Sequence, residues 1–213
     1  TGVTELMIKI PPIAADIALC AVLYVYGKKY LSTPAALALS LLYAINPLTL
    51  ATSAAWGQAD AMMTLLLALV VIFAVEGCWK AALPLYIAAV LLKPQALMFG
   101  PLGLAELIRY LLSGRKDGKL DSAKVRNAAL GLAFMALTAL AVVVPFSLRL
   151  SWDWLFNLYV STMGHYAYAT VNACNLYFLL GKNWASASSS LSGNFLLPAL
   201  MFLFACLPLL FSA

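Results

Sequence analysis

Apolar runs long enough to cross a bilayer recur along this chain, and few charges interrupt them; residues 10–26 and 128–148 are two examples. A helix rises 1.5 Å per residue, so about 20 apolar residues match the hydrocarbon core of a membrane. The chain is 64% hydrophobic and only 10% charged, which excludes an ordinary soluble domain. Because backbone groups in lipid must satisfy one another, the sequence predicts an all-α, polytopic transmembrane helical bundle.

We expect six to seven crossings, some of them short or broken. Pro47 follows Asn46 inside one apolar run, and proline both removes a backbone donor and disfavours helix at the preceding residue. Another apolar run stops at Lys93-Pro94 after only a dozen residues, too few to span alone. The expected crossings are residues 10–26, a broken one between 33 and 56, 59–75, two short ones between 81 and 112, 128–148 and 195–213.

The region from 81 to 112 allows two interpretations: one crossing with a surface helix, or two short crossings that turn near Lys93-Pro94-Gln95. The distribution of lysine and arginine separates them. With two crossings, nine of the 13 basic residues fall on one side of the membrane and four on the other. Cytoplasmic loops are enriched in Lys and Arg, so this bias favours two crossings and a cytoplasmic basic loop at 109–126.

Residues 149–194 separate the last two predicted crossings and are rich in aromatic side chains between Trp152 and Trp184. Tryptophan and tyrosine concentrate where lipid meets water. We therefore expect an interfacial outer segment here.

The ends of the chain suggest a piece of a larger membrane protein. It starts with Thr1, no signal sequence precedes the first apolar run, and it stops directly after another such run. We expect residues 1–213 to form a single transmembrane domain fragment that lacks an N-terminal span, the first outer loop and further C-terminal spans.

Cofactors and nucleic acid are not expected. The four cysteines show no C-x-x-C spacing, and His165 is the single histidine, so the sequence predicts neither a disulfide framework nor a metal site. The net charge of +5 arises largely from the basic loop beside the spans, which indicates topology rather than nucleic-acid binding.

Several polar side chains interrupt this apolar chain at positions that the charge bias assigns to the outer side. Helix breaks at membrane depth are tolerated where protein or water satisfies the freed groups, which suggests an outward-facing polar cavity. The candidate substrate-binding residues are Trp56, Gln58, Asp60, Lys93, Gln95, Tyr166, Asn172 and Asn175.

Most of these residues also have a structural interpretation. Asp60 opens a helix, where a carboxylate complements the dipole as readily as it serves chemistry. Trp56 fits an interface anchor. Lys93 beside a broken helix costs roughly 2.5–3.5 kcal/mol at mid-bilayer unless it is paired or reaches water, and a phosphate ligand would remove that cost. Asp16 lies within the first apolar run, which suggests that it links two helices through a hydrogen bond or an ion pair.

The polar motifs together resemble a known family. In order along the chain they are Ile45-Asn46-Pro47, Trp56-Gly57-Gln58-Ala59-Asp60, Leu92-Lys93-Pro94-Gln95 and Val171-Asn172-Ala173-Cys174-Asn175-Leu176. They resemble bacterial relatives of the GPI-anchor mannosyltransferases, within the GT-C superfamily of multispanning membrane glycosyltransferases.

This resemblance implies a metal-independent hexosyltransferase, mannosyltransferase-like, that moves a sugar from a polyprenyl-phosphate donor to a lipid or glycan acceptor outside a bacterial plasma membrane. Lys93 would hold the donor phosphate, Gln58, Asp60 and Gln95 would order the site, and Trp56 or Tyr166 would pack on a sugar. The catalytic Asp of such enzymes lies in a first outer loop that would precede Lys9. Its position in this chain is therefore unknown.

Two other classes fit the same residues. Broken helices and buried charges also form the binding sites of secondary transporters. A non-catalytic membrane partner subunit, which packs against another membrane protein, is the second alternative.

Overall fold

The computed structural model describes residues 2–115, 119–164, 168, 171 and 176–186 of the 213-residue chain. The chain divides into two compact units, Thr1–Val142 and Val143–Ala213. Regular structure in the described residues is helical apart from isolated bridge residues, among them the pair Tyr168 and Ser186. The predicted all-α class is confirmed.

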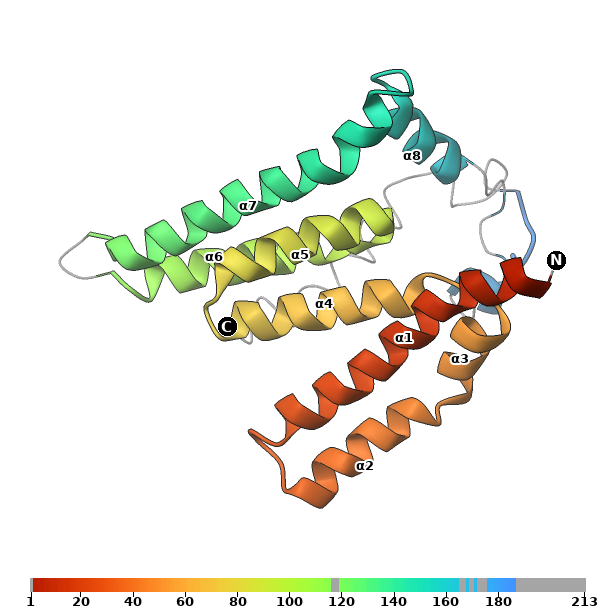
Figure 1. The fold of residues 1–213 in the computed structure, drawn as a ribbon, viewed down its shortest axis with the longest axis horizontal. Coiled ribbons are helices and arrows are strands. Elements are labelled where there is room, and N and C mark those ends of the chain that lie inside the picture. The colour runs from red at the N-terminus through yellow and green to blue at the C-terminus, as the bar shows by residue number, and fades with distance from the viewer. Residues whose placement is uncertain (1, 116–118, 165–167, 169–170, 172–175, 187–213) are drawn as a thin grey trace. The chain divides into compact units, whose positions relative to one another are not determined.

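The first unit begins with a helical hairpin. Helix α1 (Gly2–Gly27) packs against α2 (Thr33–Ala44), and α1 also lies beside α4 (Asp60–Val75) (Figure 1). A Cβ on Gly27 would lie 3.5 Å from the Ala36 Cβ, so small residues bring α1 and α2 close together. Proline in the first turn of α2 has the φ that a helix start requires.

The predicted break at Asn46-Pro47 is confirmed. Helix α2 stops before it, a short α3 (Pro47–Leu50) and a π-helical turn, η1 (Ala51–Ala55), follow, and the two pieces are bent by 44°. The Asn46 side chain accepts the Leu48 amide at 2.9 Å and so caps the new helix. The interruption is therefore built from the proline and from the asparagine cap before it.

A second hairpin contains α5 (Trp79–Leu92), the 3₁₀ turn η2 (Pro94–Phe99) and α6 (Gly100–Leu112). Trp79 and Ala82 near the start of α5 pack with Leu107 and Tyr110 near the end of α6, so α5 and α6 run in opposite directions. Helix α4 packs along α5 through a core that includes Leu67 and the fully buried Ala89. Residues 79–112 therefore fold as two antiparallel helices, and the expectation that both cross the membrane stays a prediction.

Helix α7 (Ser122–Ser147) contacts the start of α5. A Cβ on Gly131 would lie 2.5 Å from the carbonyl oxygen of Trp79, so the backbones of α7 and α5 approach each other at this point. Only glycine allows this contact without a shift of one helix.

The second unit includes α8 (Trp154–Gly164) and the one-turn α9 (Leu176–Leu179). The Trp154 indole donates to the Ser147 hydroxyl at 2.9 Å and its ring lies 5.5 Å from that of Phe146. Hydrogen bonds from Ser151 and then Asn157 hold the pKa of Asp153 below its usual value. The interfacial role of this segment stays a prediction, and the expected crossing at 195–213 lies outside the described residues.

Fewer full-length spans than expected are evident in the described part of the chain. Among the described residues, Thr4–Gly27 and Ser122–Ser147 are long and apolar enough to span alone, and the bent α2–η1 pair can make a third. Helices α4 and α5 have 16 and 14 residues. At 1.5 Å per residue they reach only about 24 and 21 Å, short of the roughly 30 Å hydrocarbon core. Six to seven full-length spans are therefore not shown.

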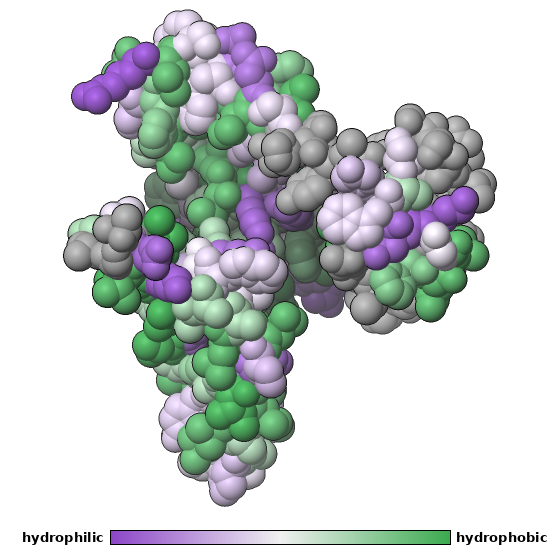
Figure 2. All heavy atoms as spheres, turned by 90° about the vertical axis from the view of Figure 1, so that its right-hand side faces the viewer, coloured by the Kyte–Doolittle hydropathy of each residue, from purple (hydrophilic) through white to green (hydrophobic). Residues whose placement is uncertain are grey.

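Hydrophobic side chains cover much of the exposed surface (Figure 2). In α7 only 6% of the most apolar window is buried against the rest of the chain, and in α1 only 17%. Such a surface is stable in contact with lipid or with other membrane helices.

The close contact at Gly131 makes a first prediction. Gly131→Ala should destabilise the first unit by about 1–3 kcal/mol, because the new methyl group meets the Trp79 backbone. Gly103→Ala in α6 is the matched control: nothing lies within 4 Å of its added Cβ, and alanine favours helix by about 1 kcal/mol. Thermal unfolding in lipid nanodiscs checks both, and an equal effect at the two glycines would contradict the packing.

Candidate functional site

Two of the predicted site residues form an ion pair. Lys93 Nζ donates to the Asp60 carboxylate, which joins the end of α5 to the start of α4. The side chains are 29% and 37% exposed, so the pair is partly shielded from water. Asp60 also lies in the first turn of α4, where its negative charge complements the helix dipole.

This pair changes the role expected for Lys93. The ammonium was predicted to bind a phosphate because an unpaired cation beside a broken helix is costly. Asp60 already removes that cost within the chain. The backbone explains why they meet, since Lys93 is extended (φ −149°) before Pro94 and leaves α5 beside the start of α4.

The other described candidates lie within a few residues of Asp60 or Lys93 along the chain, and they are exposed. Gln58 and Gln95 are exposed, and the Trp56 side chain is 74% exposed. Gly57 has φ +71°, and a Cβ there would lie 3.1 Å from Lys9 Cγ, so the turn after η1 lies close to α1. Tyr166, Asn172 and Asn175 lie outside the described residues, as does His165.

Asp16 is a link between helices, as the sequence favoured. Its carboxylate accepts a hydrogen bond of 2.6 Å from the Tyr43 hydroxyl, which joins α1 to α2. One turn along α1, the Cys20 carbonyl accepts the Ser40 hydroxyl at 2.8 Å. The partner of Asp16 is therefore a neutral hydroxyl.

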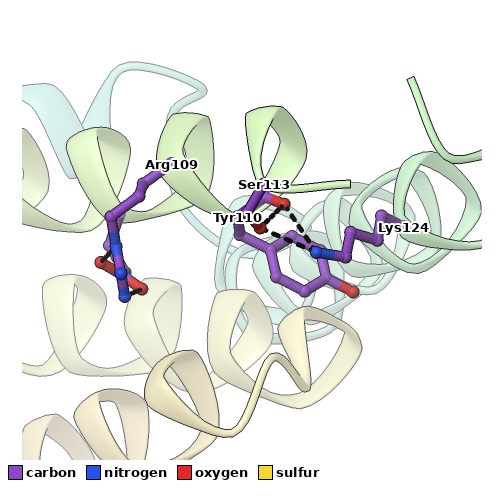
Figure 3. Close-up of polar contacts among 5 residues, drawn as sticks. Arg109, Tyr110, Ser113 and Lys124 are labelled. Carbon is purple, nitrogen blue, oxygen red and sulfur yellow. Dashed lines mark hydrogen bonds and ion pairs between the residues drawn. The ribbon is translucent and has the colours of Figure 1, made fainter. Parts of the chain in front are cut away.

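The opposite end of the first unit carries the basic residues. Lys29, after α1, pairs with Glu76 at the end of α4. Lys124 of α7 donates to the Ser113 hydroxyl at 2.8 Å and to the Tyr110 carbonyl at 3.2 Å, and its ammonium lies 4.8 Å from the Tyr110 ring centre (Figure 3). These contacts bind α7 to the end of α6.

Asn127 joins three segments at this basic end. Its side-chain amide donates to the Gly77 carbonyl at 2.5 Å and to the Tyr110 hydroxyl at 2.9 Å, and its oxygen accepts the Lys80 amide at 3.2 Å. Gly77 has φ +72°, and a Cβ there would approach Tyr110 Cε2 to 2.8 Å. This turn therefore requires glycine both for its conformation and for space.

Sequence reasoning did not identify this junction. Tyr110, Lys124 and Asn127 look like ordinary members of a basic loop and its flanks. The available signal was Asn127 at the start of a long apolar helix, where an amide side chain needs partners. Gly77 directly after an apolar run gave a second signal, because glycine often ends a helix.

The first unit also contains two hollows. A polar recess of roughly 300 Å³ at the basic end is lined by Glu76, Gly77, Cys78, Lys80, Ala123, Arg126, Asn127 and Leu130. An apolar groove of roughly 380 Å³ lies among α4, α5, α6 and α7, with Trp79, Tyr86 and Leu107 in its wall. Neither hollow is lined by the predicted candidates at the Asp60 end.

The charge-based sorting of the helix ends agrees with the fold of the first unit. The Lys29–Glu76 pair and the contacts of Lys124 and Asn127 hold one set of helix ends together. The Asp60–Lys93 pair holds ends of the opposite set. The basic side chains and the polar breaks therefore gather at opposite ends of the helices.

Comparison with known families gives a direct result. The protein-family model described as GPI transamidase subunit PIG-U matches residues 2–165. No curated protein and no solved structure matches the chain.

This match overturns the glycosyltransferase prediction. The matched family is a GPI transamidase subunit and not a GT-C glycosyltransferase, so the predicted hexosyltransferase activity, polyprenyl-phosphate donor, lipid or glycan acceptor and bacterial plasma membrane are wrong. The motifs misled because prolines and polar residues at helix breaks serve any multispanning protein. Of the two alternatives, the match favours the membrane partner subunit.

The ion pair at Asp60 yields a second prediction. In a double-mutant cycle of Asp60→Asn and Lys93→Met, the coupling free energy should be about 1 kcal/mol, at the upper end for partly exposed pairs. The control cycle uses Glu106→Gln and Arg109→Met, whose i,i+3 pair on one helix should couple by only about 0.2–0.5 kcal/mol. Unfolding in nanodiscs measures both, and zero coupling between Asp60 and Lys93 would refute their link.

Proposed function

The chain belongs to the PIG-U family of GPI transamidase subunits, and we propose that it acts as a membrane subunit of that enzyme, not as a transferase by itself. In this role its helices pack against other subunits of the complex that attaches GPI anchors to proteins. The corresponding location is the endoplasmic reticulum membrane of a eukaryotic cell.

The uncovered apolar surface of the helices is the observation that carries this role. Ile17 on α1 is 66% exposed, and Leu137 and Leu140 on α7 are 59% and 57% exposed. Lipid alone can cover such residues. A subunit must in addition offer membrane-embedded faces to its partners, and long helices with little internal burial supply them.

The state of the carboxylates also supports an assembly role. Asp60, Glu76 and Glu106 are ion-paired with Lys93, Lys29 and Arg109, and Asp16 accepts a hydrogen bond from Tyr43. A general base needs a free lone pair within reach of its substrate. Asp16, Asp60 and Glu76 instead bind separate segments of the chain to one another, and Glu106 pairs within α6.

We infer further that the short helices α4, α5 and α6 complete crossings between α2–η1 and α7. Helices α4 and α5 run between the two ends of the first unit, as the ion pairs of Lys29 and Lys93 require. Helix α6 returns to the basic end, where its Tyr110 packs with Trp79. Short helices are accommodated when the bilayer thins locally or flanking side chains reach out to water. The basic end then faces the cytoplasm.

Cysteine labelling tests this topology in a background in which the native cysteines are replaced by serine. A membrane-impermeant maleimide should reach Gln58→Cys and Gln95→Cys from the lumenal side only. It should reach Lys28→Cys and Lys80→Cys from the cytosolic side only. Labelling of Gln58→Cys and Gln95→Cys from opposite sides would exclude the arrangement.

The subunit role is tested in eukaryotic cells that lack their own PIG-U. The gene for this chain should restore GPI-anchored proteins at the cell surface, and the chain should co-purify with the other transamidase subunits. Recovery of GPI-anchored proteins without co-purification of the other transamidase subunits would contradict the subunit role. Sugar transfer by the purified chain alone would instead support the rejected glycosyltransferase assignment.

Tryptophan scanning then locates the assembly face. Leu137→Trp, Leu140→Trp and Ile17→Trp add bulk at exposed positions without adding charge. Positions facing lipid should tolerate the change, whereas those under another subunit should lower co-purification severalfold because overpacking is costly. Full tolerance at every exposed position of both α1 and α7 would exclude these helices as the interface.

A further inference from the structure

The polar recess at the basic end is lined by two basic side chains that no contact described above involves. Lys80 comes from the first turn of α5 and Arg126 from the second turn of α7. Within the described residues, neither side chain makes an ion pair or a hydrogen bond. The structure therefore collects two uncompensated positive charges around one hollow of roughly 300 Å³.

The neighbouring charged and polar groups are already engaged. Glu76 is the carboxylate in the wall of the recess, and Lys29 pairs with it. Asn127 is held by Gly77, Tyr110 and the Lys80 amide. The recess itself therefore has a positive balance.

Two other cations at this end, Arg109 and Lys124, already have partners within the chain. Arg109 is bound by Glu106 through two hydrogen bonds of 2.7 and 2.6 Å, and Lys124 is bound by Ser113 and Tyr110 (Figure 3). The Arg109 pair lies within α6, and Lys124 joins α7 to the end of α6. Lys80 and Arg126 are exposed and line an open recess, so they can take an external anion.

We propose that the Lys80–Arg126 recess binds the phosphate of an anionic phospholipid headgroup. Arginine matches phosphate through two parallel N–H donors, and lysine adds a compact point charge. The starts of α5 and α7 in its wall add the positive ends of two helix dipoles. The two helix dipoles add to the attraction for phosphate, while the side chains of Lys80 and Arg126 make the proposed contacts.

The position of the recess indicates a lipid as the source of the phosphate. It lies where apolar helices α4, α5 and α7 end or begin, the level at which headgroups meet a membrane protein. Leu130 completes the wall on α7, next to the apolar run of that helix, where acyl chains can lie. The nearest indole, Trp79, is only 2% exposed and cannot stack on a soluble nucleotide base.

The size of the recess agrees with a headgroup. Small-molecule sites begin at about 300 Å³, enough for a phosphate with a small polar substituent. This inference goes beyond the subunit role, because it concerns the basic end and does not depend on which proteins cover α1 and α7.

The experiment measures phosphatidylinositol binding to the whole chain in phosphatidylcholine nanodiscs. Lys80→Gln/Arg126→Gln should weaken binding about tenfold or more, because two headgroup contacts are lost. Lys28→Gln/Lys119→Gln removes the same charge from the basic side but outside the recess, and should change binding less than threefold. Equal weakening by the two pairs would overturn the site in favour of general attraction.

Two further measurements distinguish the source of the phosphate and guard against misfolding. Inorganic phosphate at matched ionic strength should not displace the lipid at millimolar concentration; displacement would overturn the lipid assignment in favour of a soluble anion. Phosphatidylinositol with a photoreactive headgroup should crosslink the unmodified chain at residues 76–80 and 123–130. Crosslinks confined to other segments would also overturn the proposal, whether or not the glutamine variant folds.

Discussion

Polar side chains within a lipid-embedded chain must find their partners inside that chain, and the first unit is organised by this constraint. Asp16 takes the Tyr43 hydroxyl, Asp60 takes Lys93, and Asn127 takes Gly77 and Tyr110. Each contact joins different helices or turns. These polar contacts fix which helix ends meet, while the apolar contacts between helices fill the space between them.

Glycine is also needed at the basic end, because polar contacts between helix ends require backbones that approach each other closely. Gly77 lets Tyr110 lie over the turn between α4 and α5, and this places the Gly77 carbonyl within reach of Asn127. Gly131 lets α7 contact the Trp79 carbonyl one turn beyond Asn127. The hydrogen bonds and the close packing at the basic end therefore depend on each other, and the recess lined by Lys80 forms beside this fixed junction.

Local signals in the sequence predicted local structure well. Asn46-Pro47 breaks a helix, Lys93-Pro94 ends another, and the apolar run predicted at 128–148 lies in a helix, 122–147, long and apolar enough to span. Each of these features acts on its own neighbourhood. Pairing was harder. Lys93 looked like a ligand for phosphate because nothing in the sequence shows that Asp60, 33 residues earlier, lies beside it. Asn127 was overlooked for the same reason. The family assignment failed because the motifs reported where helices break, and that property does not specify chemistry.

Side chains that have partners inside the chain stabilise its fold, whereas surfaces without such partners are available for binding. The carboxylates of Asp16, Asp60, Glu76 and Glu106 are paired internally, so they stabilise the fold. Its apolar surface on α1 and α7 is largely open, so it can be covered by lipid or by the helices of other subunits. Assembly through those faces keeps polar groups out of the interface and avoids the cost of desolvating charges. Lys80 and Arg126 remain at one end, where water and headgroups meet, and there an unpaired cation costs little until an anion arrives.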